Sequence, residues 1–286
     1  MQLAGTGIWA HQLRYADPGE IAESAALLDE LGFSALWIPD VGGDVLASSE
    51  VLLQAAPRAA VATGVLNIWM HEPADVAAHL AGWDAAWRDR FILGLGVSHS
   101  ALIDHNNPGR YAKPYTRMFE YLDGLDSAHP PVGDNARLLA ALGPRMLELA
   151  RDRAAGAFPY FVPPEHVLAA RSALNPTSVL AVELAVVLDT DPASARATAR
   201  NHTAVYVTLP NYTNNLRRFG YEDDDFAGAG SDRLVDAIVA WGDLDAIKAR
   251  VQLMRDAGAD HVCVQVIPKD DASLRADWRE LASALL

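Results

Sequence analysis

The chain has 286 residues, of which 51% are hydrophobic and 21% charged, the balance of a globular protein with a sizeable buried core. Asp and Glu number 37 against 23 Lys and Arg, and the formal charge of -14 disfavours nucleic acid and anionic membrane surfaces as partners. The single cysteine excludes an intramolecular disulfide, and neither a membrane-spanning run nor a signal-peptide pattern is present, so we expect a cytoplasmic protein.

The first expected elements are a short strand at residues 7–9 and a helix over Pro18–Leu31. Asp17 provides an N-cap, a proline suits the first helical turn, and Gly32 ends the helix. The apolar run Ala35–Ile38 that follows is typical of a parallel strand buried on both faces. The chain therefore opens with a strand, helix, strand unit.

The same succession of helix, glycine and strand returns around Gly156 and Gly258. Apolar runs bring the expected strands to eight, at residues 7–9, 35–38, 59–66, 91–95, 137–142, 156–158, 178–188 and 261–266. Alternation of eight strands with helices favours the α/β class and a closed (β/α)8 TIM barrel, with an open doubly wound sheet as the alternative. We expect a single barrel domain that spans residues 1–286.

One interval is too long for a single crossover helix. Residues 191–240 lie between the seventh and eighth expected strands, and a helix begins there at Asp191 and Pro192. A polar stretch with the acidic run 222–225 follows. We expect a helical insertion over 191–240 within the barrel domain, at the C-terminal mouth where barrel enzymes carry their active sites.

The fourth expected strand ends in the sequence Leu-Gly-Leu-Gly-Val-Ser-His, residues 93–99. Small residues here would let a flat ring approach the backbone, although two glycines also suit a tight strand exit. The pattern lacks the third glycine of a dinucleotide-binding fingerprint. His99 lies just past the strand, and an imidazole that titrates near neutrality could transfer the proton that accompanies a hydride. A histidine that only forms structural hydrogen bonds is the alternative.

Other turns also offer groups for a cofactor. Gly143, Pro144 and Arg145 follow the fifth strand and open a helix, where backbone N–H groups, the helix dipole and the arginine would attract a phosphate. The alternative is a proline that simply starts the helix. Asp40, beyond the second strand, would bind a cofactor or cap the next segment, and Asn67 suits a ring edge. No histidine pair has the spacing of a helical metal site, so we expect no metal.

Several segments resemble the luciferase-like monooxygenase superfamily, specifically its coenzyme F420-dependent branch. They are residues 35–40, 62–69, 90–99, 141–150 and 257–262, and the resemblance covers nearly the whole chain. In that family the deazaflavin lies over the C-terminal mouth of the barrel. The resemblance therefore implies an oxidoreductase that transfers a hydride between coenzyme F420 and a small, apolar organic substrate.

The resemblance also implies roles for single residues. A non-prolyl cis peptide would fall around Gly64–Val65. The proton-handling role of His99 comes from its position past the strand and not from the resemblance. The coenzyme phosphate would lie at a turn made of Leu142, Gly143, Pro144 and Arg145. The deazaflavin ring would be framed by Asp40, Gly64, Val65, Asn67, Val97 and Ser98.

Two departures separate the chain from a sugar-phosphate dehydrogenase branch of the family. That branch has Asp-His after the second strand where this chain has Asp40 and Val41, and a glutamate where this chain has His99. The sugar-phosphate substrate is therefore not expected here. An FMN-dependent monooxygenase and a flavin-binding barrel without turnover are the alternative functions. A small-molecule substrate is the expected partner, and a homodimer is a possible assembly.

Overall fold

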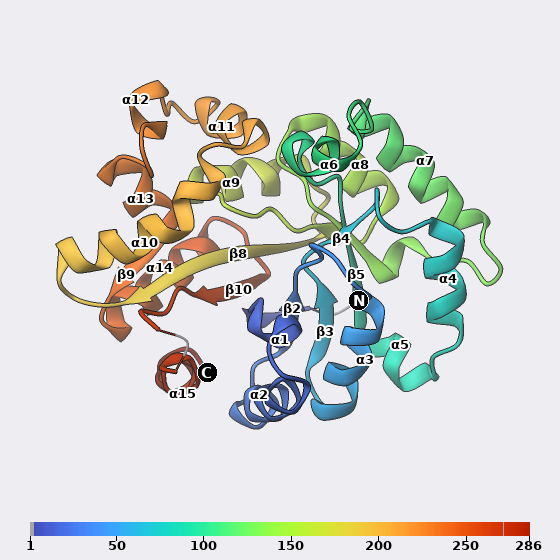
Figure 1. Ribbon diagram of the computed structural model, residues 1–286, viewed down its shortest axis with the longest axis horizontal. Helices are drawn as coiled ribbons and strands as arrows, with labels where there is room; N and C mark the ends of the chain where they lie inside the picture. Colours follow the sequence, from blue (N-terminus) through green and yellow to red (C-terminus); the bar gives the residue numbers. More distant parts are fainter. Residues whose placement is uncertain (1–2, 271) are drawn as a thin grey trace.

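The structure is a computed structural model that describes residues 3–270 and 272–286. Its parallel strands follow the order β10, β1, β2, β3, β5, β6, β7, β8, and β10 pairs with both β1 and β8, which closes the barrel. The strands of the barrel are β1 (Gly5–Trp9), β2 (Ala35–Ile38), β3 (Ala60–Thr63), β4 (Leu66–Asn67), β5 (Phe91–Gly96), β6 (Arg137–Leu139), β7 (Gly156–Ala157), β8 (Val179–Leu188) and β10 (His261–Val266). Helices surround them (Figure 1), so the predicted TIM barrel is confirmed.

The helices outside the predicted insertion connect successive strands, except α15, which follows the last strand. They are α1 (Gln12–Tyr15), α2 (Pro18–Leu31), α3 (Val45–Ala55), α4 (Pro73–Ala81), α5 (Ala85–Arg90), α6 (Ser100–Asn106), α7 (Pro114–Ser127), α8 (Pro144–Arg153), α9 (Pro164–Ala173), α14 (Leu244–Asp256) and α15 (Leu274–Leu285), with a 3₁₀ turn, η1, at Asp134–Ala136. α2 has the predicted bounds and caps: Asp17 accepts a hydrogen bond from Gly19 N at 2.9 Å, and Gly32 has a left-handed φ of 96°.

The third predicted strand is interrupted in the structure. β3 pairs with the start of β5 and β4 with its end, and the Gly64–Val65 peptide between β3 and β4 is cis, as the family resemblance predicted. A Cβ atom at Gly94 would lie 2.0 Å from Thr63 O, and one at Gly96 would lie 2.3 Å from Val65 Cγ2. The two glycines of β5 therefore make room for the neighbouring strand and its break.

The predicted insertion contains a strand as well as helices. α10 (Pro192–Tyr206), α11 (Pro210–Arg217), α12 (Asp223–Phe226) and α13 (Asp232–Ile238) are followed by β9 (Val239–Gly242). β7 pairs with only the first two residues of β8, and β9 pairs with the C-terminal end of β8 instead. The expected helical insertion is present, and only its last two residues, 239 and 240, belong to β9. The sequence did not predict β9 because this short apolar run directly continues a helix, and periodicity alone does not separate the two.

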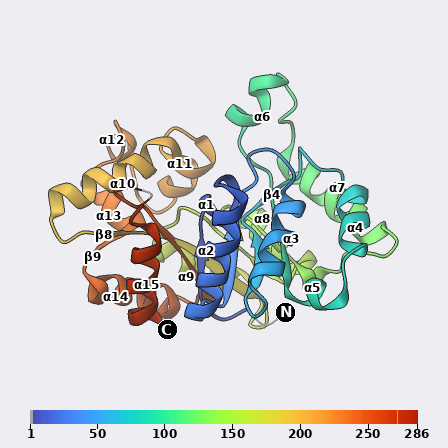
Figure 2. The ribbon, with the colours of Figure 1, turned by 60° about the horizontal axis from the view of Figure 1, so that its bottom comes forward.

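Aromatic side chains fill the interior of the barrel. The rings of Trp37 and Phe158 stack with centroids 4.2 Å apart, and Trp37 Nε1 donates a hydrogen bond to His261 Nε2 at 3.1 Å. Burial lowers the pKa of His261 to about 4, so this imidazole stays neutral. Because the interior is a packed core, the groups that can meet a ligand lie at the ends of the barrel. α6 projects beyond the other helices on the same side as α11 (Figure 2).

Candidate functional site

The predicted site residues gather at the C-terminal ends of neighbouring strands. Asp40 follows β2, the Gly64–Val65 peptide and Asn67 mark the break between β3 and β4, residues 97–99 follow β5, and residues 142–145 follow β6. These strands are adjacent in the sheet, and parallel strands end at the same rim. The structure therefore brings the predicted residues to one sector of the barrel mouth.

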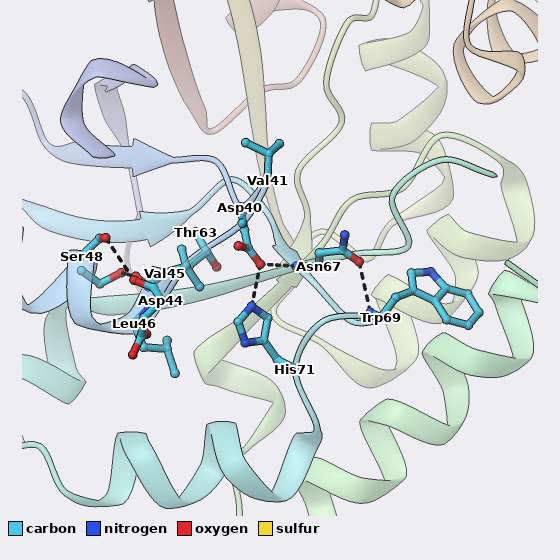
Figure 3. Close-up of polar contacts among 12 residues, drawn as sticks. Asp40, Val41, Asp44, Val45, Leu46, Ser48, Thr63, Asn67, Trp69 and His71 are labelled. Atoms are coloured by element: carbon cyan, nitrogen blue, oxygen red, sulfur yellow. Dashed lines mark hydrogen bonds and ion pairs between the residues drawn. The ribbon is translucent and has the colours of Figure 1, made fainter. Parts of the chain in front are cut away.

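The carboxylate of Asp40 joins three segments of this rim (Figure 3). Its Oδ2 accepts a hydrogen bond from Asn67 N at 3.0 Å and lies 2.8 Å from His71 Nε2, and its Oδ1 lies 3.6 Å from Arg14 Nη2. The side chain has no exposed surface, at 0%. Asp44, not Asp40, caps α3 by accepting two backbone N–H groups. The cap alternative for Asp40 is wrong, and the carboxylate instead holds Asn67 and His71 in place.

Two tryptophans hold the backbone of the same rim. Trp9 Nε1 donates to Gly64 O at 2.9 Å, next to the cis peptide, and Trp69 Nε1 donates to Val97 O at 2.7 Å. Asn67 Oδ1 accepts from Trp69 N at 3.1 Å, so the side chain predicted to meet a ring edge also fixes this tryptophan. The backbone carbonyls around the break are therefore tied to side chains from β1 and the loop after β4.

His99 lies in a desolvated position. Its ring is partly buried, Nδ1 is buried without a hydrogen-bond partner in the described part of the chain, and the ring centroid lies 5.0 Å from that of Tyr212 in α11. Burial lowers the pKa of His99 to about 4. The expectation that this imidazole titrates near neutrality is therefore wrong for the protein without ligand, because burial disfavours the charged form. At neutral pH the ring has one N–H donor and one acceptor nitrogen.

The turn at the start of α8 has open space and positive charge. Gly143 is its N-cap, no side chain caps the helix, and a Cβ atom at Gly143 would meet nothing within 4 Å. Arg145 is exposed and stacks over the ring of Tyr115 at 4.2 Å, and Arg218 donates to Leu142 O at 3.2 Å. Within residues 3–270 and 272–286, neither arginine forms an ion pair. In a chain of charge -14, this turn fits a bound anion.

Sequence reasoning missed the polar groups just inside the mouth. Glu183 lies within β8 and is 2% exposed; its Oε2 accepts a hydrogen bond from Phe161 N at 3.2 Å, and its Oε1 has no partner among the described residues. Burial raises the pKa of Glu183 to about 8. Tyr160 OH donates to Gln265 Oε1 at 2.8 Å and lies 2.9 Å from Tyr206 OH. The sequence could have indicated Glu183, because it is an acidic residue inside the apolar run of β8, and acidic residues are seldom fully buried unless they are paired.

Residues 2–130 match the family model of the luciferase-like monooxygenases. A Mycobacterium tuberculosis protein that its name assigns to the coenzyme F420-dependent oxidoreductases is 23% identical in an alignment covering 90% of this chain and 92% of the relative. The chain is therefore similar to the luciferase-like monooxygenases over residues 2–130 and to this relative over most of its length. These similarities indicate an oxidoreductase.

Solved structures show the same fold. An F420-dependent secondary alcohol dehydrogenase has a TM-score of 0.76 at 16% identity, with 99% of each chain covered. A coenzyme F420-dependent tetrahydromethanopterin reductase from Methanopyrus kandleri has a TM-score of 0.70 at 17% identity, covering 99% of this chain and 98% of its own. An FMN complex of a Baeyer-Villiger monooxygenase from Pseudomonas putida also has a TM-score of 0.70, at 14% identity, covering 99% and 97%. No helix within the described residues is long and apolar enough to cross a membrane.

Proposed function

We propose that the protein is a coenzyme F420-dependent oxidoreductase that transfers a hydride between the deazaflavin and a small, apolar organic substrate. The observation that carries this proposal is the match, over 90% of the chain, to a relative that its name assigns to F420-dependent oxidoreductases. Two of the structural neighbours are F420-dependent enzymes by name. When bound, the coenzyme supplies the hydride chemistry, and the chain supplies binding, orientation and proton handling.

The α8 turn has the properties needed to bind the coenzyme phosphate. Gly143 leaves open space there, and the start of α8 presents the positive end of the helix dipole. Arg145 and Arg218 add positive charge that no carboxylate in the described part of the chain neutralises by an ion pair. Ring-framing roles for Asp40, Gly64, Val65, Asn67, Val97 and Ser98 complete the proposed site.

The proposed role of His99 is to handle the proton at the reacting centre. Because burial lowers its pKa to about 4, the ring is neutral at physiological pH. A neutral ring accepts a proton from a substrate hydroxyl through its free nitrogen, or donates a hydrogen bond to a carbonyl oxygen through its N–H. Both directions of hydride transfer are compatible with this group.

Cofactor titrations test the proposal. Purified protein is titrated with coenzyme F420 and, separately, with FMN, and its tryptophan fluorescence is recorded; two of the seven tryptophans bond to the proposed site. We expect saturable quenching by coenzyme F420. Saturable binding of FMN alone would support the monooxygenase alternative, and binding of either cofactor without turnover on any substrate would support the non-catalytic barrel.

The variant Arg145→Ala tests the phosphate site. Loss of one charge-assisted contact at an exposed position is expected to weaken coenzyme F420 binding by about tenfold. Arg151→Ala is the matched control, because Arg151 lies at the other end of α8 and pairs with Asp152 at 2.7 Å. Equal affinities for the Arg145→Ala and Arg151→Ala variants would show that the phosphate does not bind at this turn.

A further inference from the structure

The backbone after β5 is held by side-chain donors from three different segments of the chain. Trp69 Nε1, from the loop after β4, donates to Val97 O at 2.7 Å. Tyr111 OH, from the segment before α7, donates to Ser98 O at 3.2 Å. Asn211 Nδ2, from α11, donates to the same Ser98 O at 3.0 Å and to Tyr111 OH at 3.2 Å. Two consecutive carbonyls just before His99 therefore receive three side-chain hydrogen bonds.

Ser98 needs this support because of its backbone conformation. Its φ of 54° lies in the left-handed region, which is sterically unfavourable for a residue with a Cβ atom. Such conformations persist where the surrounding structure over-determines them, and they cluster at functional sites. The bonds to Ser98 O supply that constraint, and the conformation of Ser98 sets the direction in which the chain continues to His99.

α11 contacts His99 as well. Tyr212, the residue after Asn211, is buried, and its ring centroid lies 5.0 Å from that of His99 with the planes at 43°. Tyr212 in turn packs on Tyr206 and Phe161 at 5.4 and 5.3 Å, which anchors it in the aromatic cluster of the insertion. Asn211 of α11 therefore bonds to Ser98, and the next residue, Tyr212, packs against His99.

We propose that Asn211 and Tyr212 are positioning residues, which hold the Ser98–His99 corner in the conformation that the reaction uses. The catalytic part of this inference rests on the proposed function; the positioning part does not. The insertion then acts as one wall of the active site and sets the position of the proposed proton-handling residue. Asn211 stands in an Asn-x-Thr sequence, and its side-chain amide is committed to Ser98 and Tyr111.

The variants Asn211→Asp and Asn214→Asp form a matched pair. Both are isosteric, both add one negative charge, and both lie on α11. Asn211→Asp removes the N–H donors to Ser98 O and Tyr111 OH, whereas Asn214 is exposed. An acidic residue in the first turn of a helix is favourable, so α11 itself is expected to remain folded in Asn211→Asp.

The first readout uses the protein without coenzyme. Hydrogen–deuterium exchange of amides in residues 97–112 is expected to be roughly five- to tenfold faster in Asn211→Asp than in Asn214→Asp, since net hydrogen bonds of this kind contribute about 1 kcal/mol each. Tyr111→Phe, which removes the other donor to Ser98 O, should accelerate the same segment. Equal exchange in all of these variants and the parent would overturn the proposal.

The second readout follows His99. Its imidazole nitrogens, assigned by comparison with His99→Ala, are titrated by NMR. Tyr212→Leu removes the ring against His99 and should shift its titration toward the ordinary histidine range near pH 6.5, while Tyr212→Phe keeps the ring and should titrate like the parent. Unchanged titration in Tyr212→Leu would contradict the positioning role of Tyr212.

The third readout separates this inference from the proposed function. In single turnovers with coenzyme F420, Asn211→Asp should slow hydride transfer by about tenfold with little change in coenzyme affinity, and Asn211→Asp/His99→Ala should be no slower than His99→Ala. If the parent does not bind coenzyme F420, the proposed function fails and the exchange result still decides the positioning role. If the rate losses of the two substitutions multiply, Asn211 does not act through His99.

Discussion

Replacement of the buried carboxyl by an amide, in Glu183→Gln, is expected to stabilise the protein more as the pH rises. Glu183 is 2% exposed, and burial raises its pKa from 4.5 to about 8. A carboxyl whose pKa is higher in the folded state is protonated there and ionised in the unfolded chain, so its contribution to stability falls as the pH rises from 4.5 to 8. At 1.36 kcal/mol per pKa unit, the difference between pH 5 and pH 8 is roughly 3–4 kcal/mol.

Glutamine has nearly the same shape and still accepts the hydrogen bond from Phe161 N, but it does not ionise. The free energy of unfolding is measured by urea titration at pH 5, 6, 7 and 8 for the parent, Glu183→Gln and the exposed control Glu120→Gln. The advantage of Glu183→Gln over the parent should grow by a few kcal/mol across this range. Curves that run parallel from pH 5 to pH 8 would show that Glu183 is ionised in the folded protein, against the assignment of a neutral acid inside the barrel.

Three further outcomes are expected. His99→Ala should keep its affinity for coenzyme F420 and slow single-turnover hydride transfer by about 10²- to 10⁴-fold; a parental rate would make His99 a structural residue only. Gly94→Ala, whose Cβ would lie 2.0 Å from Thr63 O, should lower the free energy of unfolding by roughly 1–3 kcal/mol, whereas Gly143→Ala, with open space, should lower it by less than about 1 kcal/mol. The pKa of buried His261 is lowered to about 4, so protonation of this group in the unfolded chain lowers the stability of the protein as the pH falls from 6.5 toward 4. His261→Asn should therefore lose less free energy of unfolding than the parent between pH 6.5 and pH 5, as measured by urea titration.

The pattern of apolar runs and caps was sufficient to predict the barrel. Each strand in a parallel barrel is buried on both faces, and each helix begins and ends at local signals such as Asp17 and Gly32, so the information lies within a few neighbouring residues. The order of strands and helices then leaves few topologies. The sequence did not predict β9, because its four residues continue α13 in the same apolar pattern. They form a strand because β7 pairs with only the start of β8, and β9 pairs with the end of β8.

For the site, the sequence by itself determined that Asn67, His99 and Gly143 follow strands, which places them on one rim of a parallel barrel. Tertiary structure alone decided what these residues contact, because each partner is distant in the chain. Trp9 reaches Gly64 across 55 residues, and Asn211 reaches Ser98 across 113. The tertiary structure also decided the protonation states of two residues. His99 is neutral and Glu183 is protonated because folding removes water from both side chains, and the extent of this desolvation cannot be predicted from neighbouring residues in the sequence.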